Sequence, residues 1–245
     1  MINQSTAAPG IITAEALRGL PDPARRFMEW TGVVGQPWIR TARVHQTGKF
    51  RLGLDKPWMP MTATQRFMTD PPGFVWQARF KLYGLPLMSA RDSYRDGQGH
   101  MFGKLAGIVT LFDDHSEPLT QGTLMRYLSE MGWFPTAYLG DNVTWTAVDD
   151  YSADVTLTDH GRSATGRMFF DDLGRPTRFQ ATRYREVNGH YSPETWSART
   201  TEYGQRGGLN IGTRAQAIWN LAAGDLEYGD FEIVEVEYNR PGEHL

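Results

Sequence analysis

The chain has 245 residues, no cysteine and a formal net charge of −3 at pH 7. The lack of cysteine excludes disulfides, thiolate nucleophiles and cysteine-ligated metal sites. The small acidic net charge provides no basic field that would attract nucleic acid or anionic lipid.

Residues 1–36 are predicted to form a helical segment that packs on one end of a sheet. Short helices are expected over 14–18 and 23–30, because two prolines separate these stretches. Gly32 follows the second stretch and is typical of a helix end.

The first ten residues have neither a basic start nor the apolar run that marks an export signal. No stretch of about 18 apolar residues predicts a membrane-spanning helix. We therefore expect a cytoplasmic location and no membrane partner.

Residues 37–240 carry the pattern of a wide antiparallel sheet. Trp76, Ala78 and Phe80 lie two residues apart, which is the spacing of a half-buried strand. Hairpin pairs such as the Asn-Gly at 188–189 recur along the segment and predict roughly ten or eleven strands. A sheet of this width must twist and curl.

One helix is expected to interrupt the sheet, over residues 120–131. Residues 99 to about 112 are expected to carry the chain to it, and the last strand of the series is expected over 231–238. Four apolar side chains of the helix fall at the spacing of one face. These are Leu124, Tyr127, Leu128 and Met131.

A short amphipathic helix is only marginally stable alone, so this one is expected to dock on the concave face of the sheet. Arg126 and Glu130 can pair on its other side. Gly132 is expected to end it in the left-handed conformation. Two alternatives stay open for its apolar side. The helix is either a structural plug, or it roofs a cavity walled by Trp133, Phe134 and Tyr138.

These elements predict a single α+β domain over residues 1–245 that is predominantly antiparallel β. The expected architecture is a strongly curved half-barrel or open barrel around the internal helix, with short N-terminal helices.

Four stretches of the chain carry a resemblance to a known family. They are KPWMPMTA at 56–63, DPPGFVW at 70–76, RYLSEMGWFPTA at 126–137 and IVEVEY at 233–238. They resemble a bacterial family labelled only as a domain of unknown function, which implies no chemistry. The order of strands, helix and strands is also distantly similar to the half-barrel fold of periplasmic lipoprotein carriers, which implies a curved sheet around an apolar cavity.

Polar residues on apolar strand faces are the candidates for chemistry. Asp92 shares a face with Met88 and Tyr94, and Gln65 and Arg183 also lie among apolar neighbours. A buried charge must be paired or functional. Asp92 is therefore expected either to pair with Arg183, or to be a carboxyl in a desolvated pocket with a pKa raised toward that of a general base.

The predicted catalytic residues are Asp92, Arg183, Gln65 and Tyr94. The predicted ligand-binding residues are mostly aromatic or lie on the helix stripe. They are Trp76, Leu124, Tyr127, Leu128, Met131, Trp133, Phe134, Tyr138, Trp145, Tyr184 and Trp196.

The six histidines have no metal-ligand spacing, and no metal is predicted, although a site built from scattered histidines and carboxylates stays open. No dinucleotide or phosphate-binding fingerprint occurs, so no cofactor is expected.

Three functions remain. The first is cofactor-independent acid–base chemistry on an apolar, aromatic or terpenoid-like small molecule by a lyase, isomerase, cyclase or hydrolase. The second is non-catalytic binding or carriage of a hydrophobic ligand. The third is a scaffold with a filled core. The expected partner is an apolar small molecule rather than nucleic acid, and the oligomeric state is left open.

Overall fold

The computed structural model describes residues 10–82, 84–187 and 189–245. The first nine residues, on which the expected location partly depends, lie outside this range, as does the turn residue Asn188.

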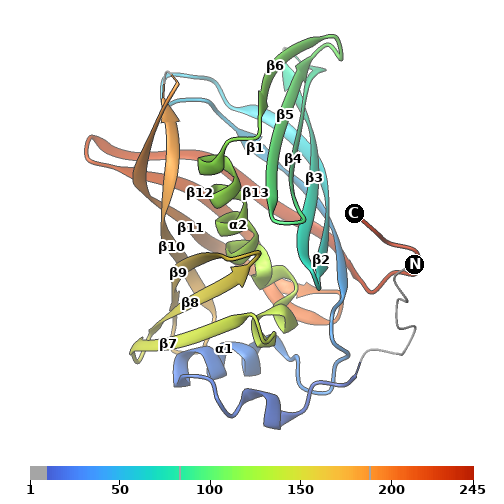
Figure 1. The fold of residues 1–245 in the computed structure, drawn as a ribbon, viewed down its shortest axis with the longest axis vertical. Helices are drawn as coiled ribbons and strands as arrows, with labels where there is room; N and C mark the ends of the chain where they lie inside the picture. Colours follow the sequence, from blue (N-terminus) through green and yellow to red (C-terminus); the bar gives the residue numbers. More distant parts are fainter. Residues whose placement is uncertain (1–9, 83, 188) are drawn as a thin grey trace.

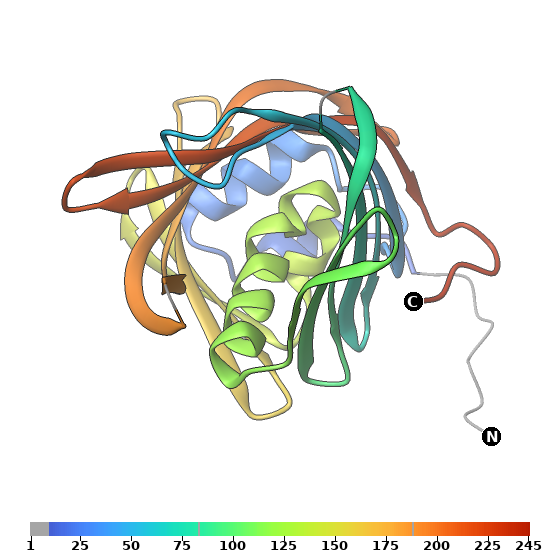
Figure 2. The same cartoon turned by 90° about the horizontal axis from the view of Figure 1, so that it is seen from above.

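A single 13-stranded antiparallel sheet forms most of the molecule (Figure 1). Its order is β6-β5-β4-β3-β2-β1-β13-β12-β11-β10-β9-β8-β7, so the first and last strands of the chain pair in its middle. The sheet curls around a helix, and β6 and β7 form its two edges (Figures 1 and 2). The predicted antiparallel, open-barrel fold with an internal helix is therefore confirmed. The strands are β1 (Thr41–Phe50), β2 (Met59–Thr69), β3 (Pro72–Leu82), β4 (Leu85–Arg95), β5 (Gln98–Leu105), β6 (Val109–Asp114), β7 (Val143–Asp149), β8 (Ser152–Asp159), β9 (Arg162–Phe170), β10 (Pro176–Val187), β11 (His190–Arg206), β12 (Leu209–Leu221) and β13 (Gly224–Tyr238).

Residues 99–112, which carry the chain to α2, contain a reversal and form most of β5 and β6. The turn has Ala106 at φ 51° and Gly107 at φ 72°. Alanine seldom adopts a left-handed conformation, so the sequence gives only the glycine as a turn signal.

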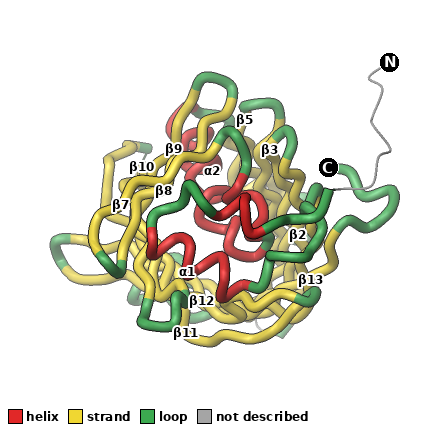
Figure 3. The backbone as a smooth tube through the Cα atoms, turned by 90° about the horizontal axis from the view of Figure 1, so that it is seen from below, coloured by secondary structure: helices red, strands yellow, loops and turns green. Residues whose placement is uncertain are grey.

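The N-terminal segment contains a 3₁₀ turn, η1 (Ala14–Leu17), and a helix, α1 (Asp22–Thr31). The helix ends at Gly32 with φ 77°, as its sequence predicts. Phe27 of α1 packs 5.6 Å from the Phe170 ring and 5.9 Å from the Tyr138 ring. The segment thereby closes the lower end of the curl, beside β7 (Figures 1 and 3).

Helix α2 (Glu117–Glu130) runs inside the curl. It begins three residues before the predicted start, because the Ser116 hydroxyl caps it by accepting a hydrogen bond from the Leu119 N–H at 3.3 Å. The expected left-handed end at Gly132 is wrong. The chain continues instead through two 3₁₀ turns, η2 (Met131–Trp133) and η3 (Pro135–Leu139).

The apolar stripe of α2 is packed rather than placed over a cavity. Leu124, Tyr127, Leu128 and Met131 are each no more than 1% exposed, which leaves no space for a water molecule beside them. The adjoining Phe134 and Tyr138 are equally buried. These six side chains are part of the packed core, as the structural-plug alternative expects, and a role for them in ligand binding stays a prediction.

Candidate ligand-binding site

Aromatic side chains of neighbouring strands line part of the concave face, the face of the sheet that turns toward α2. The Phe50 ring lies 5.7 Å from Phe80 and 5.6 Å from Tyr228, and the Trp219 ring stacks 6.2 Å from Tyr228. The Trp196 indole N–H donates a 2.8 Å hydrogen bond to the Tyr228 hydroxyl. We call these five residues the aromatic belt. Trp76 continues it at one end and Phe179 at the other.

Solvent reaches the middle of the aromatic belt. Phe50, Trp219 and Tyr228 are only half-buried, although they lie inside the curl. The reason is the position of α2, which contacts β3, β4 and β5 on one side and β9 and β10 on the other. The helix thus bridges the two margins of the sheet and faces β12, β13 and β1 across the curl (Figure 2).

A cleft of about 410 Å³ opens beside α2, between the helix and β10. Gly122 and Met125 line it from the helix, and Arg183 lines it from β10. One Arg183 Nη donates a 3.1 Å hydrogen bond to the Gly122 carbonyl, and the guanidinium lies 4.7 Å from the Trp196 ring centroid. This cleft therefore adjoins the aromatic belt.

A buried polar cluster joins α2 to strands β1, β2 and β4 on the concave face. It consists of Gln46, Gln65, Asp92, Arg126 and Glu130. The Arg126 guanidinium donates to the Asp92 carboxylate at 2.5 Å and to Glu130 at 2.8 Å. The Gln65 amide donates to Glu130 at 2.7 Å, and Gln46 donates to Gln65 at 3.4 Å.

The charges of this cluster are unequal, since two carboxyl groups surround one guanidinium. Burial raises the pKa of Glu130, and this effect outweighs the opposing influence of Arg126. Burial acts to lower the pKa of Arg126, but Glu130 and Asp92 overcome it, so its pKa is raised and the guanidinium stays charged. A protonated Glu130 would leave Asp92 and Arg126 as a neutral pair. One Asp92 oxygen, Oδ1, is buried without a hydrogen-bond partner among the described residues.

Asp92 and Gln65 lie on the concave face, where their strand phase places them, with 2% and 0% exposure. The predicted pairing of Asp92 with Arg183 is wrong, because Asp92 binds Arg126. Strand phase defines the face of a residue but not its place around the sheet, and β4 and β10 stand seven positions apart in the strand order.

The other predicted polar groups lie elsewhere. The Tyr94 hydroxyl donates to Asp159 at 2.6 Å, and burial together with this carboxylate raises the Tyr94 pKa. Tyr184 is 45% exposed and lines the cleft beside α2, so its role in ligand binding stays a prediction. A catalytic role for Asp92, Arg183, Gln65 and Tyr94 stays a prediction.

The predicted tryptophans divide between the aromatic belt and the lower core. Trp196 is part of the belt, and Trp76 adjoins it at one end. Trp133 and Trp145 are half-buried near η2 and η3, where the Trp145 N–H donates to the Tyr138 carbonyl at 3.2 Å. Sequence reasoning did not single out the remaining residues of the belt and the cluster as parts of a site. They are Phe50, Phe80, Trp219, Tyr228, Gln46, Arg126 and Glu130.

A larger hollow of about 630 Å³ lies on the outer face, across β1 to β5. Its rim is formed by exposed polar side chains such as Thr62, Gln77 and Arg79. This open, polar surface offers less to an apolar molecule than the concave face does.

The fold and the concave face define a helix-plugged, open antiparallel barrel with an aromatic wall. The chain belongs to the family of unknown function DUF6544, whose model matches residues 10–231. This confirms the resemblance to a family without assigned chemistry. Among curated proteins, none matches the sequence.

Several solved structures are similar to this chain. A proposed outer membrane lipoprotein-sorting protein domain from Vibrio parahaemolyticus is 7% identical, with a TM-score of 0.48 and coverage of 93% of this chain and 95% of the other. A DUF1329 family protein from Desulfovibrio piger is 9% identical, with a TM-score of 0.49 and coverage of 91% and 92%. A LolA superfamily protein from Nitrosomonas europaea is 10% identical, with a TM-score of 0.43 and coverage of 94% of each chain. At these values the likenesses define no ligand or activity for the present chain.

No helix among the described residues is long and apolar enough to cross a membrane.

Proposed function

We propose that the protein binds an apolar small molecule, without transforming it, between α2 and the aromatic belt. The observation that carries this proposal is the partial exposure of Phe50, Trp219 and Tyr228 inside the curl. Covering apolar surface is favourable by about 25 cal/mol per Å². Flat rings on one wall also suit an aromatic or long apolar ligand.

Arg183 indicates that the ligand carries an acidic group. It forms no ion pair within the described part of the chain, and its buried Nε has no hydrogen-bond partner there. Its guanidinium lies against Trp196, and it lines the cleft beside α2. A carboxylate seated there would supply the missing acceptor and the counter-charge. The proposed ligand class is therefore an amphipathic acid with an apolar body.

Calorimetric titration with palmitate and with its neutral alcohol tests this proposal. Trp219→Ala is expected to weaken palmitate binding roughly tenfold or more, which corresponds to about 1.4 kcal/mol. Trp58→Ala is the matched control, because Trp58 lies outside the belt and contacts Lys49 and Arg51. Arg183→Gln is expected to abolish the preference for the acid over the alcohol. Equal binding by the Trp219 variant and the wild type, or no binding of either probe, would reject the proposal.

Acid–base chemistry is the second candidate, favoured by the raised pKa of Glu130 beside Asp92. General acids and bases act best when their pKa lies near the working pH. The test is mass spectrometry of a bound ligand before and after incubation with the wild type and with Asp92→Asn and Glu130→Gln. Conversion that both variants retain would exclude these two carboxyls as the reacting groups.

A further inference from the structure

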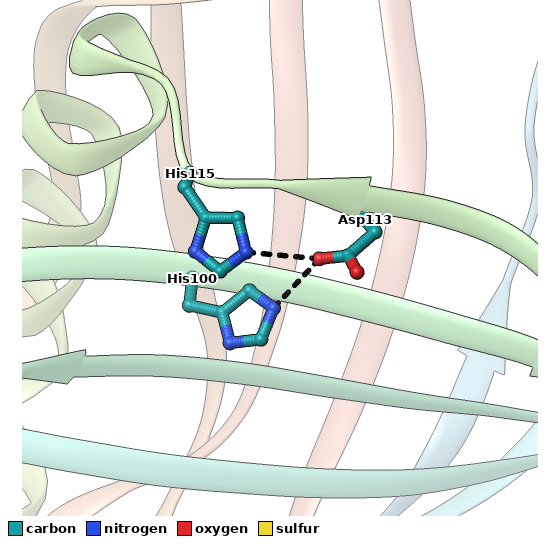
Figure 4. A group of neighbouring side chains, drawn as sticks. All are labelled: His100, Asp113 and His115. Atoms are coloured by element: carbon teal, nitrogen blue, oxygen red, sulfur yellow. Dashed lines mark hydrogen bonds and ion pairs between the residues drawn. The ribbon is translucent and has the colours of Figure 1, made fainter.

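We propose that His100, Asp113 and His115 bind a divalent transition-metal ion of the zinc type. The His100 Nε2 lies 2.9 Å from Asp113 Oδ1, and the His115 Nε2 lies 3.1 Å from the same oxygen. The two imidazole rings stack with centroids 3.9 Å apart. Three ligand atoms therefore converge within 4.8 Å of one another (Figure 4).

The hairpin of β5 and β6 brings these residues together. Phe102 pairs with Asp113 across the two strands, and His100 lies two residues before Phe102 on the same outer face. His115 follows the end of β6, where the chain turns into α2 (Figure 4). Asp114 fixes this junction, because its carboxylate accepts hydrogen bonds from the Ser116 N–H at 2.8 Å and the Tyr191 hydroxyl at 2.5 Å.

The donor set determines the class of ion. Two neutral imidazole nitrogens and one carboxylate oxygen are ligands that zinc and its neighbours accept, whereas calcium and magnesium prefer oxygen alone. Zinc binds imidazole nitrogen at about 2.0–2.1 Å, so small side-chain rotations would suffice to place an ion between the three atoms.

Solvent access completes the site. The side chains of His100, Asp113 and His115 are 38%, 49% and 65% exposed. An ion can therefore enter directly, and water can fill the remaining coordination position. Because His115 belongs to the connection into α2, a bound ion would tie the edge of the sheet to the beginning of this helix.

The same contacts could be ordinary histidine–aspartate hydrogen bonds, and metal titration separates the two interpretations. The full chain is titrated with Zn²⁺ by calorimetry at a pH above the ordinary histidine pKa of about 6.5. We expect saturation by a single ion. His100→Ala, Asp113→Asn and His115→Ala should each weaken binding at least roughly tenfold, because even groups that only orient a ligand contribute that much. Asp113 and His115 are exposed and His100 is partly exposed, and circular dichroism verifies that each variant is folded.

His160→Ala is the matched control, since His160 is also exposed and also contacts an aspartate, Asp159, at 2.9 Å. It should bind the ion as the wild type does. Co²⁺ provides a second readout, because its visible absorption should show nitrogen and oxygen ligands that are lost in the His100→Ala/His115→Ala double variant. The proposal is overturned if the wild type shows no saturable binding, if binding survives in the double variant, or if His160→Ala abolishes it equally.

Discussion

Replacing Arg126 with methionine tests the buried polar cluster directly. Methionine keeps an unbranched side chain of similar reach but removes the guanidinium, which lies 2.5 Å from Asp92 and 2.8 Å from Glu130. The side chains of these acids are only 3% and 12% exposed. Both carboxyl groups would then stay in the interior without a cation.

Removal of one partner from a buried ion pair costs about 3–5 kcal/mol. The Arg126 side chain is 17% exposed, which lets water approach the carboxyls and favours the lower end, about 3 kcal/mol. The loss should shrink at acid pH. Protonation of Glu130, whose pKa burial already raises, removes one of the two uncompensated charges.

Urea unfolding at pH 7 measures this loss. Arg167→Met is the control, because Arg167 forms a 2.7 Å pair with Asp154 on the surface, with side chains 43% and 32% exposed. Such a surface pair should contribute less than about 1 kcal/mol. If Arg126→Met destabilises the protein no more than Arg167→Met does, the cluster is not the buried charge network described above.

Three further predictions concern the fold. Because burial raises the pKa of Glu130, the stability that its proton binding contributes is complete below the ordinary pKa of 4.5 and is lost as pH rises through the raised value. Glu130→Gln should remove this part of the pH dependence in urea unfolding, and an unchanged profile would contradict it. Gly166→Ala would place a Cβ 2.0 Å from the Phe179 ring, so a loss of about 1–3 kcal/mol is expected in thermal unfolding, and an unaltered Tm would mean that the ring moves freely. Ser116→Ala removes the α2 cap and should cost about 1 kcal/mol, whereas Ser116→Asp should retain most of the stability.

Local periodicity predicted which face a strand residue occupies, but not what stands opposite it. Asp92 and Gln65 lie on the concave face because side chains of a strand alternate strictly between two faces. The partner of Asp92 depends on how the sheet curls and where α2 docks, which are long-range features. Arg126 was therefore recognisable as a partner of Glu130, four residues away, but not as the partner of Asp92.

The aromatic belt also contains a residue that local sequence patterns could not predict. The strand expected over 231–238 begins at Gly224 in the structure, so Tyr228 lay outside the prediction. Residues 222–230 contain two glycines and three acidic residues, which weaken a strand signal. Pairing with β1 and β12 on both sides holds this stretch in the sheet despite its composition.

Arg126 extends from α2 toward the sheet and Arg183 extends from β10 toward α2, and their surroundings give them different roles. The charge of Arg126 is balanced by two carboxyl groups that belong to the protein, so Arg126 serves the attachment of α2. Arg183 donates to the Gly122 carbonyl and lies against Trp196, but no carboxylate within the described residues forms an ion pair with it. A guanidinium beside half-buried rings, with its charge unbalanced, is suited to an acid that comes from outside the chain. The filled core beneath α2 and the open aromatic belt opposite it are therefore compatible: the first holds the helix in place, and the second leaves a surface for a ligand.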